Sequence, residues 1–182
     1  MKITVLGAGA WGTALAKALR ENGNAVTIWD INAETLKEIQ NGRSEKYLPG
    51  VELPTDWKTQ PDFAKAIGGA ECLVLAVPSQ AFRSVAAKLK GHPGIFVSVT
   101  KGIEYETGDT MSRILRELAP ADRVVALSGP SFAREVALGI PTTVVCACKT
   151  TARPKPCRDF SIARNSAFTA ARTFSAWNTA AR

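Results

Sequence analysis

A glycine-rich turn near the N-terminus constrains the fold of this chain more than any other sequence feature. The segment Gly7-Ala8-Gly9-Ala10-Trp11-Gly12 has the spacing G-x-G-x-x-G and directly follows the β-rich run 2–6. Helical spacing of apolar residues begins within it, and Asp30 stands 18 residues beyond the last glycine, after a second apolar run at 25–29. This strand–turn–helix–strand context predicts the phosphate-binding turn of a dinucleotide-binding βαβ unit.

Each glycine of the motif has its own predicted role. Gly7 allows the tight turn, Gly9 lets a pyrophosphate approach the backbone, and Gly12 lets the helix pack closely on the strand. The pyrophosphate then lies at a helix N-terminus, where free N–H groups and the helix dipole favour an anion. The alternative is a glycine-rich turn without a ligand.

Asp30 is the candidate for recognising the adenosine ribose. Its carboxylate can accept hydrogen bonds from the ribose hydroxyls and would repel the 2′-phosphate of NADP. We therefore expect the cofactor to be NAD in preference to NADP. The alternative is an Asp that caps the next helix or is merely solvated.

The alternation continues along the chain and predicts the fold class. Further β-rich runs occur at 72–77, 95–99, 124–127 and 142–145, with helical periodicity between them, and residues 43–61 read as a long connection containing three prolines. Strands separated by helices form a parallel sheet with right-handed crossovers and helices on both faces. We expect an α/β, doubly wound, Rossmann-type dinucleotide-binding domain over residues 1–148.

Residues 149–182 differ in composition from the rest. Of the net charge of +7, the balance is +1 over residues 1–148 and +6 over residues 149–182, where Leu and Val are absent. Three interpretations are open: a basic tail that binds an acidic partner, a solvated linker, or a segment translated in a shifted reading frame. We favour the third and expect a disordered or out-of-frame segment that builds little core.

Several classes of function are disfavoured. The basicity belongs to the tail and no nucleic-acid-binding motif is present, so we expect no nucleic-acid partner. Four cysteines without a C-x-x-C pair and a single histidine predict no metal site. The sequence contains no apolar run of the ~18 residues that a membrane helix needs. No signal peptide precedes the glycine-rich turn, so we expect a cytoplasmic protein.

Two predicted loops lie at the carboxyl ends of later strands, where doubly wound sheets bind ligands. Val77-Pro78-Ser79 follows the run 72–77, and Pro78 is a candidate wall near the nicotinamide or part of an ordinary strand-exit turn. Thr100-Lys101-Gly102 follows the run 95–99. Lys101 is placed to bind a phosphate or polarise a carbonyl group, although a lone lysine is more often solvated.

Four segments together resemble one enzyme family. GAGAWGTALA at 7–16, VPSQ at 77–80, TKGIE at 100–104 and SGPSFAREVALGIPT at 128–142 are similar, in order and spacing, to bacterial NAD(P)-dependent glycerol-3-phosphate dehydrogenases. The resemblance implies reversible hydride transfer between NAD(P)H and dihydroxyacetone phosphate to give sn-glycerol 3-phosphate, which supplies glycerophospholipid synthesis. It also implies a homodimer for full-length members.

The resemblance assigns roles to individual residues. Ala10, Trp11 and Ala133 would contact the cofactor, Lys101 both cofactor and substrate, and Gly129 and Ser131 the substrate. Family members often carry Arg or His just beyond the second strand, where this chain has Asp30-Ile31, another reason to expect weak NADP binding.

One part of the family pattern has no counterpart in this chain. Members continue into a helical second domain that carries the lysine thought to donate a proton, and residues 149–182 do not resemble that segment. The catalytic acid is therefore unknown here, and we expect a truncated or frame-shifted dehydrogenase that retains cofactor binding with little or no turnover. The alternatives are a related superfamily reductase with another substrate and a catalytically silent NAD-binding module.

Overall fold

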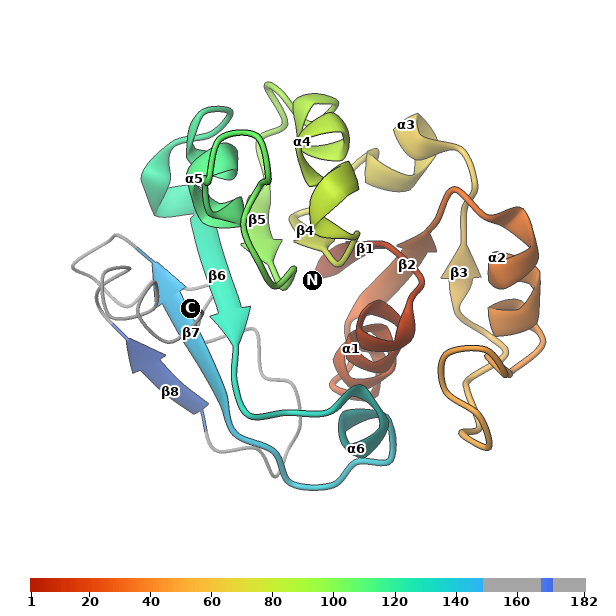
Figure 1. The fold of residues 1–182 in the computed structure, drawn as a ribbon. Helices are drawn as coiled ribbons and strands as arrows, with labels where there is room; N and C mark the ends of the chain where they lie inside the picture. The colour runs from red at the N-terminus through yellow and green to blue at the C-terminus, as the bar shows by residue number, and fades with distance from the viewer. Residues whose placement is uncertain (149–167, 172–182) are drawn as a thin grey trace.

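The computed structural model describes residues 1–148 and 168–171, and Figure 1 shows their arrangement. The strands are β1 (Lys2–Leu6), β2 (Ala25–Trp29), β3 (Lys58–Thr59), β4 (Cys72–Leu75), β5 (Ile95–Ser98), β6 (Val124–Ser128), β7 (Val144–Cys148) and β8 (Phe168–Ala171). The helices are α1 (Ala10–Glu21), α2 (Ala33–Gln40), α3 (Phe63–Ile67), α4 (Ser79–Ala87), α5 (Met111–Arg116) and α6 (Ala133–Ala137), with the 3₁₀ turn η1 (Ala121–Arg123).

The strands form one sheet whose order confirms the predicted fold class. The order is β3-β2-β1-β4-β5-β6-β7-β8, and every pair from β3 through β6 is parallel. An order of 3-2-1-4-5-6 is that of doubly wound dinucleotide-binding domains. The order reverses between β1 and β4, so the carboxyl ends of these two strands mark the ligand-binding edge of the sheet.

Helices cover both faces of the sheet, as Figure 1 shows. Side chains of α1, α2 and α6 belong to one apolar cluster, and side chains of α3, α4 and α5 belong to another. Alternate residues of a strand reach opposite clusters, so that Ile3 and Val5 enter the first and Leu6 enters the second. Burial on both faces explains why these strands read as continuous apolar runs.

The structure differs from the predicted parallel arrangement at β7. This strand covers Val144–Cys148 instead of 142–145 and pairs antiparallel with β6, with Leu127 opposite Cys146. The reason lies in α6, which at five residues spans only ~7.5 Å and is too short to carry the chain back across the sheet. The chain therefore re-enters the sheet from the edge at which β6 left it.

The segment 149–182 contributes one described element. Phe168–Ala171 forms β8 and pairs in parallel with β7. The expectation of a disordered or out-of-frame tail otherwise falls on residues 149–167 and 172–182, which lie outside the described part of the chain.

The connection at 43–61 is more ordered than its prolines predict. It contains β3, which pairs with β2, and its side chains Leu48, Val51, Leu53 and Trp57 are buried against the α1 face of the sheet. The indole N–H of Trp57 donates to the carbonyl of Ile39 at 3.2 Å. A two-residue strand is too short to show a period of two, so β3 left no pattern in the sequence.

Candidate functional site

The glycine-rich turn lies where the ends of β1 and β4 meet. Gly7 has φ +112°, and a Cβ built on it would stand 2.7 Å from the carbonyl oxygen of Ala76. A Cβ on Gly12 would overlap the carbonyl oxygen of Gly7. Both positions therefore require glycine for steric reasons, as the motif predicts: Gly7 for the turn and Gly12 for the close approach of α1.

Gly9 is different, because among residues 1–148 and 168–171 a Cβ added there meets no atom within 4 Å beyond its two chain neighbours. It is the N-cap of the 12-residue helix α1 and has an extended backbone that any residue adopts. Gly9 precedes the first turn of α1, which contains Ala10 and Trp11 and whose N–H groups have no intrahelical acceptor. The free N–H groups and the helix dipole at such an N-terminus favour an anion such as a pyrophosphate group.

Asp30 lies directly after β2 and is half-buried beside the turn. Its Oδ2 accepts the N–H of Ala8 at 2.7 Å, and its Oδ1 accepts the N–H of Asn32 at 2.8 Å. Asn32, not Asp30, caps α2 by accepting the N–H groups of Glu34 and Thr35. The carboxylate thus ties the glycine-rich turn to the end of β2, and each oxygen retains a lone pair for a further donor.

The predicted loops after β4 and β5 are held together by one threonine. The hydroxyl of Thr100 donates toward the carbonyl oxygens of Val77 at 2.7 Å and Leu75 at 3.2 Å. Pro78 caps α4, and Lys101 is exposed on the loop that follows β5. The structure therefore brings Lys101 to the same edge of the sheet as the glycine-rich turn.

An ion-pair cluster that includes Glu104, on the loop that carries Lys101, was not predicted. Arg83 of α4 makes a bidentate pair with Glu104, at 2.6 Å from Nε to Oε1 and 2.8 Å from Nη2 to Oε2. These bonds, with a 2.6 Å bond from Thr107, hold the pKa of the Glu104 carboxyl below its ordinary value. Hydrogen bonds to Glu104 and then Glu117 raise the pKa of Arg83. Sequence separation hides this cluster, because Arg83 and Glu104 lie 21 residues apart.

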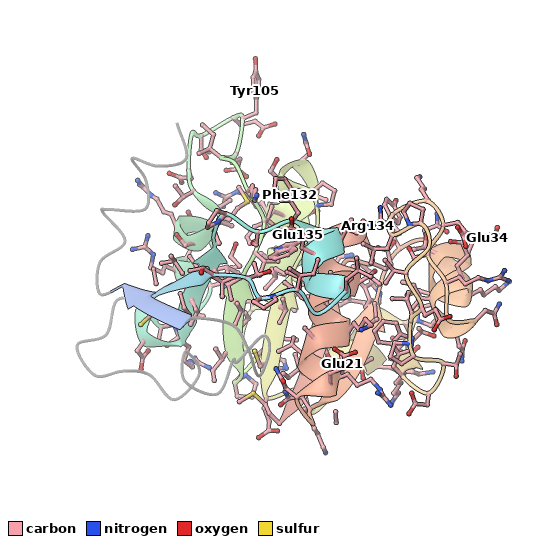
Figure 2. The ribbon with its side chains drawn as sticks, turned by 90° about the horizontal axis from the view of Figure 1, so that it is seen from below. Glu21, Glu34, Tyr105, Phe132, Arg134 and Glu135 are labelled. Carbon is pink, nitrogen blue, oxygen red and sulfur yellow. The ribbon has the colours of Figure 1, made fainter. Side chains whose placement is uncertain are left out.

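The segment after β6 brings the remaining predicted residues to the site. A Cβ on Gly129 would lie 2.6 Å from the carbonyl oxygen of Thr143, so packing against the start of β7 requires glycine there. Ser131 is half-buried, and Ala133 opens α6, which packs against α1. Figure 2 shows Phe132 and Glu135 on this segment and Tyr105 pointing away from it at the tip of the Lys101 loop.

Comparison with known proteins gives the same assignment as the motifs. The family described as NAD-dependent glycerol-3-phosphate dehydrogenase N-terminus matches residues 2–153. The chain belongs to this family. The glycerol-3-phosphate dehydrogenase (NAD(P)+) of Anaeromyxobacter sp. strain K is 47% identical over 156 residues, which cover 82% of this chain and 47% of that protein. The enzyme of Lysinibacillus sphaericus is 47% identical over 154 residues, covering 81% and 46%.

A solved structure agrees with the family assignment. The crystal structure of glycerol-3-phosphate dehydrogenase from Coxiella burnetii superposes with a TM-score of 0.83 at 27% identity, covering 95% of this chain and 54% of that one. The chain spans about half the length of the curated relatives it matches. The family description places the matched region at the N-terminus of these enzymes.

Other chemistry-bearing groups of the domain lie away from this edge. Cys72 is buried in β4. Burial, followed by the charge of Glu71, raises the pKa of its thiol to about 12, which makes it a poor nucleophile.

Within residues 1–148 and 168–171, no cluster of three His, Cys, Asp or Glu residues forms a metal site. The same residues contain no helix long and apolar enough to cross a membrane.

Proposed function

We propose that this domain binds NAD(H) at the glycine-rich turn and serves hydride transfer between NAD(P)H and dihydroxyacetone phosphate to give sn-glycerol 3-phosphate. The observation that carries the proposal is the contrast within the motif. Gly7 and Gly12 are required by packing, whereas a Cβ built on Gly9 lies within 4 Å of no other described residue apart from its two chain neighbours. A glycine that the fold itself does not need, at the N-terminus of α1, is best explained by a ligand that approaches the backbone.

Different residues of the chain would bind different parts of the cofactor. The first-turn N–H groups at Ala10 and Trp11 would hold the pyrophosphate, and Asp30 would accept the ribose hydroxyls. Ala133, on the segment that packs against α1, would border the cofactor. When bound, the nicotinamide supplies the hydride.

The substrate half of the proposal rests on the family. Lys101 would contact both cofactor and substrate, with its ammonium group attracting the substrate phosphate. Gly129 and Ser131 would hold the substrate from the segment after β6. These residues bind and orient a small phosphorylated ketone, and the group that donates the proton is not assigned to this chain.

A preference for NAD over NADP follows from Asp30. Hydrogen bonds to Ala8 and Asn32 fix its carboxylate beside the turn. A fixed negative charge there accepts ribose hydroxyls and repels a 2′-phosphate. We expect NADH to bind at least about tenfold more tightly than NADPH, which corresponds to about 1.4 kcal/mol.

The test is a fluorescence titration of the 182-residue chain with NADH, followed by NADH oxidation with dihydroxyacetone phosphate. Gly9→Ala should weaken NADH binding by at least about tenfold, because its methyl group enters the pyrophosphate space, while the free energy of unfolding changes by less than about 1 kcal/mol. Gly68→Ala is the control, since Gly68 has φ −59° and no Cβ contact below 3.3 Å. Absence of NADH binding by the folded wild-type chain would refute the proposal. Binding without turnover would assign it cofactor binding alone.

A further inference from the structure

The loop that carries Lys101 is fastened to α4 by an ion pair. Glu104, three residues after Lys101, receives both Nε and Nη2 of Arg83 in the bidentate pair. The third guanidinium nitrogen, Nη1, donates to Glu117 at 2.6 Å. One arginine therefore joins α4, the Lys101 loop and the residue that ends α5.

Glu104 is built into the structure and is not a surface acid. It is only 8% exposed, and its backbone N–H and carbonyl bond with Asp109 at 2.8 Å and Gly108 at 2.9 Å. Thr107 adds a third hydrogen bond to its carboxylate. Exposed ion pairs are worth little, whereas a bidentate pair with a buried carboxylate fixes the geometry of both partners.

The other end of the loop is fastened as well. The hydroxyl of Thr100 donates to the carbonyl oxygens of Leu75, the last residue of β4, and of Val77 just beyond it. Lys101 thus stands between two fixed points, one at Thr100 and one at Glu104, while its own side chain is exposed.

From this arrangement we infer that Arg83 and Glu104 are positioning residues that hold Lys101 at the ligand-binding edge of the sheet. The inference rests on the proposed function, which gives Lys101 its contact with the dinucleotide. A lysine on an unanchored loop must be ordered when ligand binds, and that ordering weakens affinity. The Arg83–Glu104 pair orders the loop before the ligand binds. The pair therefore affects NADH affinity only through the position of Lys101.

A double-mutant cycle on NADH affinity tests this dependence, because a purely structural role would not couple to Lys101. Arg83→Ala should weaken NADH binding by roughly threefold to tenfold, and Lys101→Ala by at least as much. In the Lys101→Ala background, Arg83→Ala should have no further effect. Glu104→Gln, which keeps the side-chain shape, should repeat the result if Arg83→Ala does not fold.

The control is Glu21→Gln, which breaks the exposed Lys17–Glu21 pair at the end of α1 and should leave NADH affinity unchanged. Equal losses from Arg83→Ala in both backgrounds would overturn the inference, as would the absence of any loss from Arg83→Ala or from Lys101→Ala. A folded wild-type chain that binds no NADH would instead refute the proposed function, and the inference would fall with it.

Discussion

The turn after β1 and the loop after β5 lie at the same edge of the sheet but are shaped by different forces. The turn is shaped by backbone contact, since Gly7 and Gly12 have no room for a Cβ. The loop is shaped by side chains, through the Thr100 hydroxyl and the Arg83–Glu104 pair. The candidate site thus combines a steric element, which does not respond to pH, with an electrostatic element, which does.

The two elements also differ in how closely they depend on the fold. Gly12 has to be glycine before α1 can pack against β1, so the turn forms with the core. The ion pair of Arg83 and Glu104 is made by side chains and joins α4 to the loop after β5, two segments that follow the paired strands β4 and β5. Replacement of Gly7 or Gly12 should therefore strongly lower the stability of the domain, whereas loss of the Arg83–Glu104 pair should change binding first.

The largest effect is expected from Gly12→Ala. Its methyl group would overlap the carbonyl oxygen of Gly7, which is backbone and cannot move aside cheaply. We expect a loss of more than about 3 kcal/mol in the free energy of unfolding, measured by denaturant titration with circular dichroism. Gly9→Ala, three residues earlier in the same motif, is the matched control. Similar stability of the two variants would show that steric contact does not set this turn.

A smaller effect is expected from Thr100→Val, which keeps the side-chain shape and removes the hydroxyl. The carbonyl oxygens of Val77 and Leu75 then lose a donor, at a cost of about 1–2 kcal/mol in unfolding free energy. Thr100→Ser retains the donor and should lose less. If the Val variant is as stable as the wild type, the hydroxyl does not join the two loops.

The smallest effect is the pH dependence of the Glu104 pair. Because its pKa is lowered in the folded state from 4.5, the unfolded chain binds the proton first as the solution is acidified. The stability difference between wild type and Glu104→Gln should be full above pH 4.5 and should shrink as the pH falls through the lowered folded pKa. Thermal denaturation across that range checks the sign. A difference that grows on acidification would contradict the pairing.

The parts of the fold that could be predicted are those that depend on residues close to one another in the sequence. Strand β1, the turn and α1 follow from residues within 20 positions of one another, and periodicity located the helices around Phe82 and Ile114. β3 and α3 were not predicted, because elements of two and five residues are too short to show a periodic pattern of apolar residues. The antiparallel direction of β7 was not predicted either, because it depends on where α6 packs and not on the residues of β7.

The same division applies to the site. The motif predicts that Gly7, Gly9 and Gly12 form a phosphate-binding turn, but the motif alone does not say which of these glycines the fold itself requires. Asp30 was predicted as a ribose acceptor, and that role remains a prediction, whereas its bond to Ala8 is visible only in three dimensions. Arg83 is an ordinary helix residue in sequence and acquires its partners only when α4 meets the loop after β5.

Residue types at short, fixed spacing were enough to predict the fold class, the glycine-rich turn and the family, because each of these depends on a local pattern. Tertiary structure alone decided the edge at which β7 returns, the freedom around Gly9 and the anchoring of Lys101 through Arg83 and Glu104. The physical reason is that these features are distances between segments far apart in the chain. Such distances are set by packing of the whole sheet and its helices, and no local pattern encodes them.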